Sequence, residues 1–325
     1  MKRLEIGMLH HDLEFAEQEL TSLLRERDVI VNHYDVRNCF LEKIIKNDLV
    51  LNRVYASVAN RDYRSIVLTL NLLREIEKRG VYCLNSYKTS GYDYDKYQTF
   101  RRLSYGGVPT PESIFIDMKE DLKEKSEKLE SLLGFPLIIK RNSGGRGKDV
   151  CKIETPEEFV SIMSSKRELA RGEGYFGSFI AQEFVKPVRG YDCRVNIIDG
   201  NYTFAFARTL IPSKEGEEPW FGSVSNGSKE LPSFRPTIDE INLAIRSTNL
   251  IGALVNEVDI SFSEDGPVVI ENNPTPNYFN KINDNKRMVQ FVDSTLNFLK
   301  RNSEKSYKEG KQNLGLTKTR TEIIE

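Results

Sequence analysis

Two kinds of hydrophobic pattern alternate along the first 88 residues. Short apolar runs predict strands at residues 4–9, 29–34, 48–51 and 81–84, and longer segments with apolar residues every three or four positions predict helices at 14–27 and 63–79. The second helix is expected to stop at Gly80, because glycine commonly ends helices. Strands that alternate with helices are typical of a mostly parallel sheet, so this part is predicted to be a small α/β unit.

Beyond this unit the pattern changes to charged helices and strands in a less regular order. Strands are predicted at 136–140, 179–185, 193–198 and 202–210, and helices at about 120–133 and 286–300. Thr155 and Thr237 are each followed three residues later by a glutamate, which is the capping-box pattern of a helix start. Residues 303–325 carry few apolar groups, and we expect a solvated tail there.

Composition narrows the class of protein. The 325 residues are 39% hydrophobic, enough to bury a core, and 47 Lys and Arg nearly cancel 48 Asp and Glu. A chain without a strong net charge is not expected to bind nucleic acid or a membrane surface. No segment reaches the roughly 18 apolar residues of a membrane helix. Four scattered cysteines and an N-terminus unlike a signal peptide favour the cytoplasm.

A glycine-rich loop follows the predicted strand that ends at Lys140. Its sequence is Asn142-Ser143-Gly144-Gly145-Arg146-Gly147-Lys148. Glycines let successive backbone N–H groups turn toward one anion, and the nearby basic side chains add positive charge, so the loop is a candidate phosphate site. A flexible hairpin tip is the alternative that the loop alone leaves open. Its spacing matches neither the P-loop nor the dinucleotide-binding fingerprint.

A second candidate site lies in a predicted hairpin that carries Asp259 on one strand and Glu271 and Asn273 on the other. With a three-residue turn at 264–266, Asp259 stands opposite Glu271, and alternation along the strand places Asn273 on the same face. A two-residue turn would put Glu271 on the other face. Facing carboxylates suit a cation such as Mg²⁺, and a solvated hairpin is the alternative.

Two further features carry a weaker signal. The apolar strand 180–185 leads into the connection 189–194, a combination suited to meet an adenine with backbone groups and a ribose with a carboxylate. A purely structural strand is the alternative. The three histidines, at positions 10, 11 and 33, all lie in the first unit and are expected to be surface or packing residues.

Taken in order, these segments resemble the ATP-grasp superfamily. Within it they are most similar to the RimK-type ligases, which include ribosomal-protein glutamate ligase and the carrier-protein ligases of lysine biosynthesis. The resemblance spans about residues 1–300 and rests on seven stretches: DLVLNR at 48–53, YCLNS at 82–86, Asp95-Lys96 leading to VPTP at 108–111, PLIIK at 136–140, QEFV at 182–185, GYDCR at 190–194 and ENNP at 271–274.

The resemblance implies a role for each motif residue. The phosphates would be held by the paired lysines Lys96 and Lys140 and by the loop residues Ser143, Gly144, Gly145, Arg146 and Gly147. Adenine would meet Gln182, Glu183, Phe184 and Val185, and the ribose would meet Asp192. The catalytic residues would be Lys140, Arg194 and Arg208, the two arginines holding the γ-phosphate and the substrate carboxylate. The metal ligands would be Asp259, Glu271 and Asn273.

The fold that the resemblance implies is α/β, of the ATP-grasp kind. Its expected parts are a parallel-sheet unit (1–88), a linker helix and lid subdomain (89–185), a C-terminal subdomain with the metal site (186–302) and the flexible tail (303–325). The last two folded parts would sandwich the nucleotide. The loop 142–148 is expected to close as a lid, because an acyl phosphate must be kept from water.

The implied activity is ATP-dependent formation of an amide bond between a carboxylate and an amine through an acyl phosphate, adding an amino acid to a peptide, protein or carrier end. ATP and Mg²⁺ are the expected cofactors, with Mn²⁺ as a substitute, and a homo-oligomer is left open. Two alternatives are a dipeptide or glutathione-synthetase-like ligase and a non-catalytic ATP-grasp module that binds a peptide. A dinucleotide-dependent oxidoreductase is disfavoured, because the first strand runs into Leu9-His10-His11-Asp12 rather than glycines.

Overall fold

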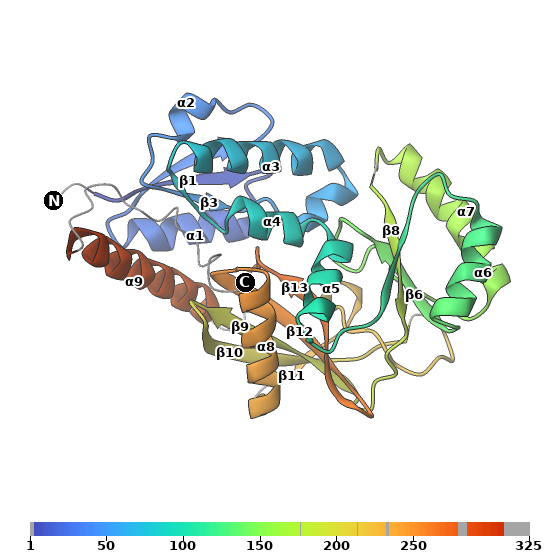
Figure 1. The fold of residues 1–325 in the computed structure, drawn as a ribbon. Helices are drawn as coiled ribbons and strands as arrows, with labels where there is room; N and C mark the ends of the chain where they lie inside the picture. Colours follow the sequence, from blue (N-terminus) through green and yellow to red (C-terminus); the bar gives the residue numbers. More distant parts are fainter. Residues whose placement is uncertain (1–2, 176, 213, 232–233, 279–284, 309–325) are drawn as a thin grey trace.

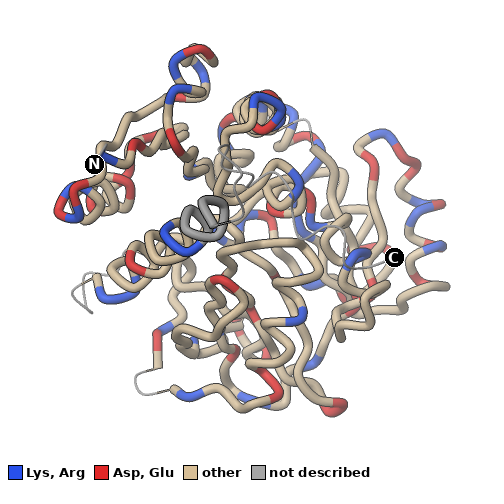
Figure 2. The backbone as a smooth tube through the Cα atoms, turned by 60° about the vertical axis from the view of Figure 1, so that its left-hand side comes forward, with Lys and Arg blue, Asp and Glu red and all other residues tan. Residues whose placement is uncertain are grey.

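The computed structural model describes residues 3–175, 177–212, 214–231, 234–278 and 285–308 (Figure 1). In these ranges the strands form one parallel and two antiparallel sheets, which confirms the predicted α/β class. No helix within the same ranges combines the length and the apolar character needed to cross a bilayer. Basic and acidic residues are interspersed along the chain (Figure 2), as the near-zero net charge leads one to expect.

The first sheet is parallel and has the strand order β2-β1-β3-β4. Its strands are β1 (Glu5–His10), β2 (Ile30–Asp35), β3 (Leu49–Asn52) and β4 (Tyr82–Leu84), and the accompanying helices are α1 (Phe15–Arg25), α2 (Leu41–Ile44), the 3-10 turn η1 (Ala56–Asn60) and α3 (Tyr63–Lys78). Ile66, Leu73 and Ile76 are buried along one face of α3, at the spacing that the sequence predicts. The sheet lies between α3 and α1 (Figure 1).

The second sheet is antiparallel and has the order β5-β8-β6-β7. Its elements are β5 (Ser113–Ile116), β6 (Leu137–Arg141), β7 (Cys151–Ile153) and β8 (Phe179–Glu183), with the helices α6 (Leu122–Leu132) and α7 (Pro156–Gly172). Leu129, Phe159 and Met163 of these helices share a buried core with Leu137 and Phe179 of the sheet. One face of the sheet is therefore covered by helices, which leaves the other free to line a cavity.

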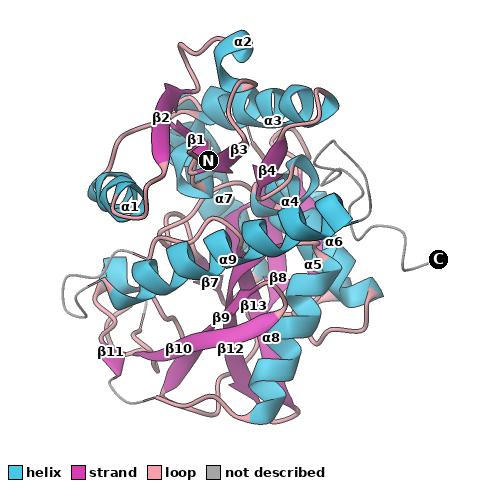
Figure 3. Cartoon of the chain, turned by 90° about the vertical axis from the view of Figure 1, so that its left-hand side faces the viewer, coloured by secondary structure: helices cyan, strands magenta, loops and turns pink. Residues whose placement is uncertain are grey.

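The third sheet is antiparallel and has the order β11-β10-β9-β12-β13. Its elements are β9 (Tyr191–Ile198), β10 (Asn201–Thr209), η2 (Val224–Asn226), β11 (Glu230–Leu231), β12 (Val255–Ser263) and β13 (Gly266–Asn273), with the helices α8 (Ile238–Leu250) and α9 (Lys286–Lys308). Leu243 and Ala244 of α8 are buried against this sheet. Met288 and Phe291 of α9 are buried together with Leu20 of α1, so α9 joins the third sheet to the first unit (Figure 3).

The link between the first two sheets contains helices that the sequence analysis does not resolve. They are α4 (Tyr87–Asp93) and α5 (Lys96–Tyr105). Their starts are marked by Ser86 and Asp95, whose side chains accept hydrogen bonds from backbone N–H groups of the first turn. Both helices are short and carry few periodic apolar residues, so capping is the stronger sequence signal for them.

The other predicted strands and helices are present, and some of them begin or end at other residues than predicted. The strand predicted at 179–185 stops at Glu183, because its partner strand β6 begins opposite that residue. The last helix continues to Lys308, since no glycine or proline follows before Gly310. Residues 309–325 of the predicted tail lie outside the described residues. The full capping box is found at Thr237, whereas Thr155 caps its helix without a reciprocal glutamate bond.

Candidate active site

A cavity of about 470 Å³ lies between the second and third sheets. The second sheet contributes β6, β8 and the glycine-rich loop, and the third contributes residues of β9, β10, β12 and β13. With the exception of Ser143, the candidate site residues named from the sequence all line this cavity. Ser143 is buried beside Tyr175, whose hydroxyl accepts a hydrogen bond from its backbone N–H at 3.3 Å. Ser143 does not line the cavity in this structure, and its predicted contact with the nucleotide stays a prediction.

The hairpin of β12 and β13 places Asp259 opposite Glu271. The predicted three-residue turn is wrong, however, because Ser263 pairs with Gly266 and only residues 264–265 lie between them. A two-residue turn in an unbroken ladder would turn Glu271 toward the other face of the sheet. The observed pairing therefore needs a second irregularity.

That irregularity is a bulge in β13. Ile260 pairs with Val269, whereas the next residue back along β12, Asp259, pairs with Glu271. Ile270 is the extra residue in this strand, and it shifts the register by one position. The bulge compensates for the shorter turn and brings both carboxylates to the cavity.

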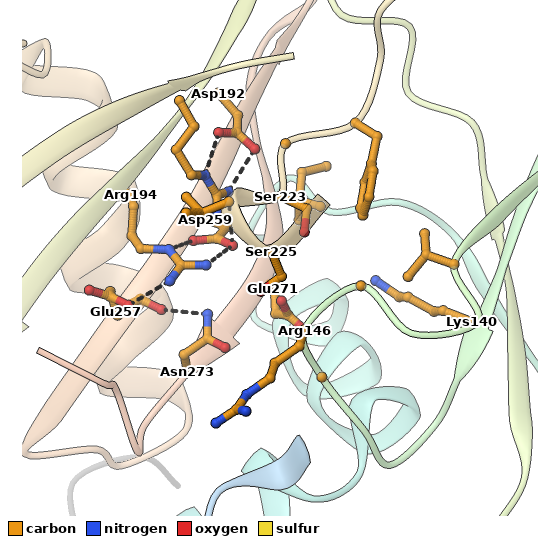
Figure 4. Close-up of a pocket in the computed structure, with 18 of the residues that line it drawn as sticks. Lys140, Arg146, Asp192, Arg194, Ser223, Ser225, Glu257, Asp259, Glu271 and Asn273 are labelled. Atoms are coloured by element: carbon orange, nitrogen blue, oxygen red, sulfur yellow. Dashed lines mark hydrogen bonds and ion pairs between the residues drawn. The ribbon is translucent and has the colours of Figure 1, made fainter. Parts of the chain in front are cut away.

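Five side chains of alternating charge form a row of ion pairs across the third sheet (Figure 4). Asp192 accepts two hydrogen bonds from Arg208, at 2.9 and 2.7 Å. Arg208 also donates to Asp259 at 3.2 Å, and Arg194 donates to the same carboxylate at 2.5 and 2.8 Å. Arg194 also donates a hydrogen bond of 2.8 Å to Glu257, which is the last member of the row. The strand register places these residues side by side, since Arg194 is paired with Asp259 and Arg208 with Asp192.

Burial and ion pairing have opposite effects on the pKa values of the carboxyl groups in this row. Burial acts to raise the pKa of Asp259, but contact with Arg194 and Arg208 outweighs burial and holds that pKa below its ordinary value. At Glu257 burial outweighs Arg194, and the pKa of the carboxyl group is raised. Asp259 is therefore a carboxylate at neutral pH whose negative charge is shared by two guanidinium groups.

Two lysines, Lys96 and Lys140, face this row of ion pairs. The Nζ atom of Lys96 lies 2.9 Å from Glu271 and donates to the carbonyl oxygen of Gly144 at 2.9 Å. Lys140 is only 7% exposed, and its Nζ atom lies 4.8 Å from the ring centre of Phe100. Among the described residues it has no hydrogen-bond or ion-pair partner. Burial, assisted by Lys96, lowers the pKa of Lys140 to about 8. A buried ammonium group that forms no ion pair favours the binding of an anion such as a phosphate.

The glycine-rich loop lies folded over the cavity and contacts two other parts of the molecule. Arg146 donates to Glu14 of the first unit at 2.8 and 3.0 Å. Gly147 has a φ of +69°, and a Cβ atom built there would lie only 2.8 Å from the ring of Phe221. Glycine at this position therefore allows both the left-handed backbone and the close approach of the opposite wall. The loop encloses one side of the cavity.

The hinge, the segment 182–185 that is predicted to meet adenine, lines the cavity beside an aromatic group. Phe184 and Trp220 meet edge to face with ring centres 5.9 Å apart, and Trp220 lies next to Phe221 at 5.4 Å. Lys152 lies above the Phe184 ring, with its Nζ atom 4.6 Å from the ring centre. These rings give this end of the cavity the apolar character that a flat heterocycle needs.

Among the cavity residues that the sequence analysis does not identify, three are charged side chains close to the candidate ligands and substrates: Glu257, Arg287 and Asp93. Glu257 could have been found, because it lies two positions before Asp259 on one strand and so faces the same way. Arg287 lies at the start of α9, where it contacts Glu230 at 2.9 Å, and Asp93 ends α4. Neither Arg287 nor Asp93 belongs to a recognisable motif, so only the fold brings them to the site.

Two antiparallel sheets that enclose lysines on one side and carboxylates on the other define the ATP-grasp class of ligases. Residues 93–292 match the model of the RimK-like ATP-grasp domain, and the chain belongs to this family. It is an ATP-dependent ligase of the carboxylate–amine class.

Curated relatives and solved structures agree with this family. A protein of Hydrogenovibrio crunogenus named "Probable alpha-L-glutamate ligase" is 30% identical over 70% of this chain and 69% of its own length. A protein of Cellvibrio japonicus with the same name is 27% identical over 81% of this chain and 84% of its own. A RimK-domain ATP-grasp protein of Sphaerobacter thermophilus has a TM-score of 0.60 at 17% identity, covering 90% and 98% of the two chains. D-alanine–D-alanine ligase of Bacillus anthracis, complexed with ATP, reaches 0.64 at 18% identity, covering 92% and 99%.

Proposed function

We propose that this ligase activates the carboxylate of a peptide or amino acid with ATP and joins it to the amine of an acidic amino acid such as L-glutamate. The observation that carries the proposal is the ammonium group of Lys140, which has no ion-pair partner in the described residues and faces Asp259 and Glu271 across the cavity. The names of the relatives support glutamate as a substrate. The arginines that line the cavity, Arg287 included, are further support, because an acidic substrate brings carboxylates that need cationic partners.

The nucleotide would lie with its base at residues 182–185 and its phosphates at Lys96 and Lys140. The aromatic group at Phe184 suits the base, and the folded glycine-rich loop would cover the phosphates. Asp192 is the candidate for the ribose, although both of its oxygens already accept hydrogen bonds from Arg208. Its ribose role therefore requires either a shared oxygen or a shift of that arginine.

The donor atoms around Glu271 fit a magnesium ion. Asp259, Glu271 and Asn273 offer two carboxylates and one amide, and hard oxygen ligands in small number suit Mg²⁺ that is completed by phosphate oxygens. The described residues contain no cluster of three or more His, Cys, Asp or Glu side chains able to hold a metal on its own. Bound there, the ion would neutralise phosphate charge during phosphoryl transfer.

The difficulty in this reaction is that a carboxylate must attack a triphosphate of like charge. One oxygen of the carboxylate bonds to the γ-phosphorus, the bond to the β-phosphate oxygen breaks, and ADP leaves with the electron pair. Arg194 and Arg208 are the candidates to hold the two anions together. Both now bind Asp259, so we expect them to turn partly toward substrate oxygens once a cation reaches that carboxylate.

Product analysis tests this proposal. The enzyme is incubated with ATP, Mg²⁺ and L-glutamate, alone or with a short peptide, and mass spectrometry follows the products. The expected result is ADP and a product heavier by one glutamyl residue. Products from free neutral amino acids alone would favour the dipeptide-ligase alternative. D-alanine–D-alanine ligase, which has a similar fold, is an enzyme of that kind. Binding of ATP without turnover on any acid and amine would contradict the proposal and favour a non-catalytic module.

Trp220 is the single tryptophan of the chain and lines the cavity beside Phe184, so it reports on nucleotide binding. We expect ATP to change its emission in a saturable way, because a base at the hinge alters the surroundings of the indole ring. Titration of the wild-type enzyme with ATP measures the effect. Unchanged emission at ATP concentrations that saturate turnover would place the base elsewhere.

The affinity for ATP should fall as the pH rises through about 8, the pKa to which burial lowers Lys140. Above that pH the free enzyme loses the ammonium charge, and bound phosphate restores it by raising the pKa again. Binding should therefore take up a proton between pH 8 and 9. Calorimetry in buffers of different ionisation enthalpy measures this uptake, and proton release in that range would show that another group dominates.

A further inference from the structure

The segment 274–276, directly after Asn273, is fixed by side chains from the N-terminal part of the chain. The carbonyl groups of its two prolines accept hydrogen bonds from Asn85 at 2.6 Å and from Arg53 at 2.8 Å. The threonine between the prolines hydrogen-bonds with Asp93. These contacts build one wall of the cavity just beyond the candidate metal ligands, where a second substrate would approach.

Asp93 differs from the other two side chains because it lines the cavity itself. The residue is 7% exposed, and its Oδ2 atom has no hydrogen-bond partner among the described residues. The charged groups nearest to it come from three elements: Lys96 on α5, Glu271 on β13 and Arg53 after β3. Lys96 is already engaged with Glu271 at 2.9 Å, and no cation of the described chain lies within ion-pair distance of Asp93.

The other buried or half-buried carboxylates of the cavity are all paired in the described ranges. Asp192 and Asp259 contact arginines, and so do Glu257 and Glu230, while Glu271 contacts a lysine. A buried carboxylate oxygen without a donor is costly unless a partner arrives. Because the nearby cations of the described residues do not contact Asp93, a cationic group of the substrate is a suitable partner for it.

We propose that Asp93 receives the ammonium group of the acceptor and takes up one of its protons before the amine attacks. The inference rests on the proposed ligase function and adds the residue that recognises the amine. The carboxylate accepts one proton, and the freed lone pair of nitrogen bonds to the acyl carbon. The carbon–oxygen bond to phosphate then breaks, phosphate leaves with the electron pair, and the second nitrogen proton leaves with it.

The acid strength of Asp93 suits this exchange. Burial raises its pKa to about 7, while Thr275 and Lys96 act in the opposite direction. The α-ammonium group at a peptide N-terminus has a pKa of about 8 and that of a free amino acid is higher, so the ammonium group is the weaker acid and Asp93 accepts the proton from it against a modest difference in pKa. Because the pKa is raised, Asp93 is able to accept a proton above pH 7 and loses this capacity as the pH falls below it.

Hydroxylamine separates this step from carboxylate activation, because it is uncharged at neutral pH and attacks an acyl phosphate without help. The wild-type enzyme and Asp93→Asn are given ATP, Mg²⁺, L-glutamate and a short peptide that supplies the carboxylate, with and without hydroxylamine. We expect the variant to form hydroxamate at close to the wild-type rate and amide about 100-fold more slowly. Asp239→Asn, an exposed position on α8, is the matched control and should change neither rate.

Equal loss of hydroxamate and amide, or loss of neither, would overturn the proposal. Asp93→Ser serves as a second variant, since serine keeps a polar partner for Thr275. If neither variant retains the melting temperature and the ATP titration of the wild-type enzyme, Asp93 is a structural residue and the proposal fails. A wild-type enzyme that forms neither hydroxamate nor amide would instead contradict the proposed function.

Discussion

Lys140→Met is expected to lower kcat/KM for ATP by about 1000-fold, the upper range for removal of one preorganised charge from an active site. The ammonium group is buried and lies beside Phe100, and no carboxylate of the described residues forms an ion pair with it, although Glu271 and Asp259 raise its pKa from farther away. Its charge is therefore available for the phosphates. Methionine retains the apolar stem that packs in the cavity, so the substitution removes mainly the charge.

The fold should survive this substitution, because a buried cation without a partner does not stabilise the folded state. We expect a melting temperature equal to or above that of the wild-type enzyme. Lys128→Ala, at an exposed position on α6, is the control for loss of a lysine from the same subdomain. Steady-state ADP release measures the effect, and turnover within a factor of about 10 of the wild-type rate would exclude Lys140 from the phosphate site.

Glu271→Gln is expected to raise the Mg²⁺ concentration for half-maximal activity at least 10- to 100-fold, since even indirect partners of metal ligands contribute about that much to affinity. The substitution preserves size and removes one carboxylate from the pair that faces the cavity. It also releases Lys96, which contacts Glu271 at 2.9 Å. Activity is followed in a magnesium titration at fixed, saturating ATP.

Glu264→Gln provides the matched control, because this glutamate lies at the exposed tip of the same hairpin. It should leave the magnesium titration unchanged. If both variants need the same Mg²⁺ concentration for half-maximal activity, the pair of facing carboxylates is not the metal site. A lower maximal rate with an unchanged magnesium midpoint would instead assign Glu271 to the positioning of Lys96.

The parallel sheet and the positions of most elements follow from local patterns in the sequence. Ile66, Leu73 and Ile76 illustrate this, because their spacing on one helix face predicts the burial that α3 shows. Glycine and capping residues mark several ends in the same way. Such signals act over a few residues, and so they are readable without the tertiary fold.

The hairpin shows where local reasoning stops. The expected pairing of Asp259 with Glu271 is present, but it results from a two-residue turn compensated by a bulge at Ile270 rather than from a three-residue turn. A bulge depends on the packing of neighbouring strands, and no residue type at this place announces it. The right pairing was therefore predicted for the wrong geometric reason.

The remaining site residues depend on contacts between distant segments. Asp93 and Arg287 reach the cavity because α4 and α9 dock against the third sheet, and neither belongs to a motif. The position of Ser143 shows the converse, since it belongs to the loop motif but is buried against Tyr175. Sequence patterns identify candidates for a site, whereas packing decides which side chains face the cavity.

The central claim, that the carboxylate is activated by phosphorylation, is tested most directly by isotope transfer. The acid substrate is labelled with heavy oxygen in its carboxylate, and the phosphate released during amide formation is analysed by mass spectrometry. One labelled oxygen should pass to each phosphate, because the carbon–oxygen bond breaks when the amine attacks the acyl carbon and the phosphate leaves with the bridging oxygen that came from the carboxylate. Amide formation with unlabelled phosphate would contradict the account.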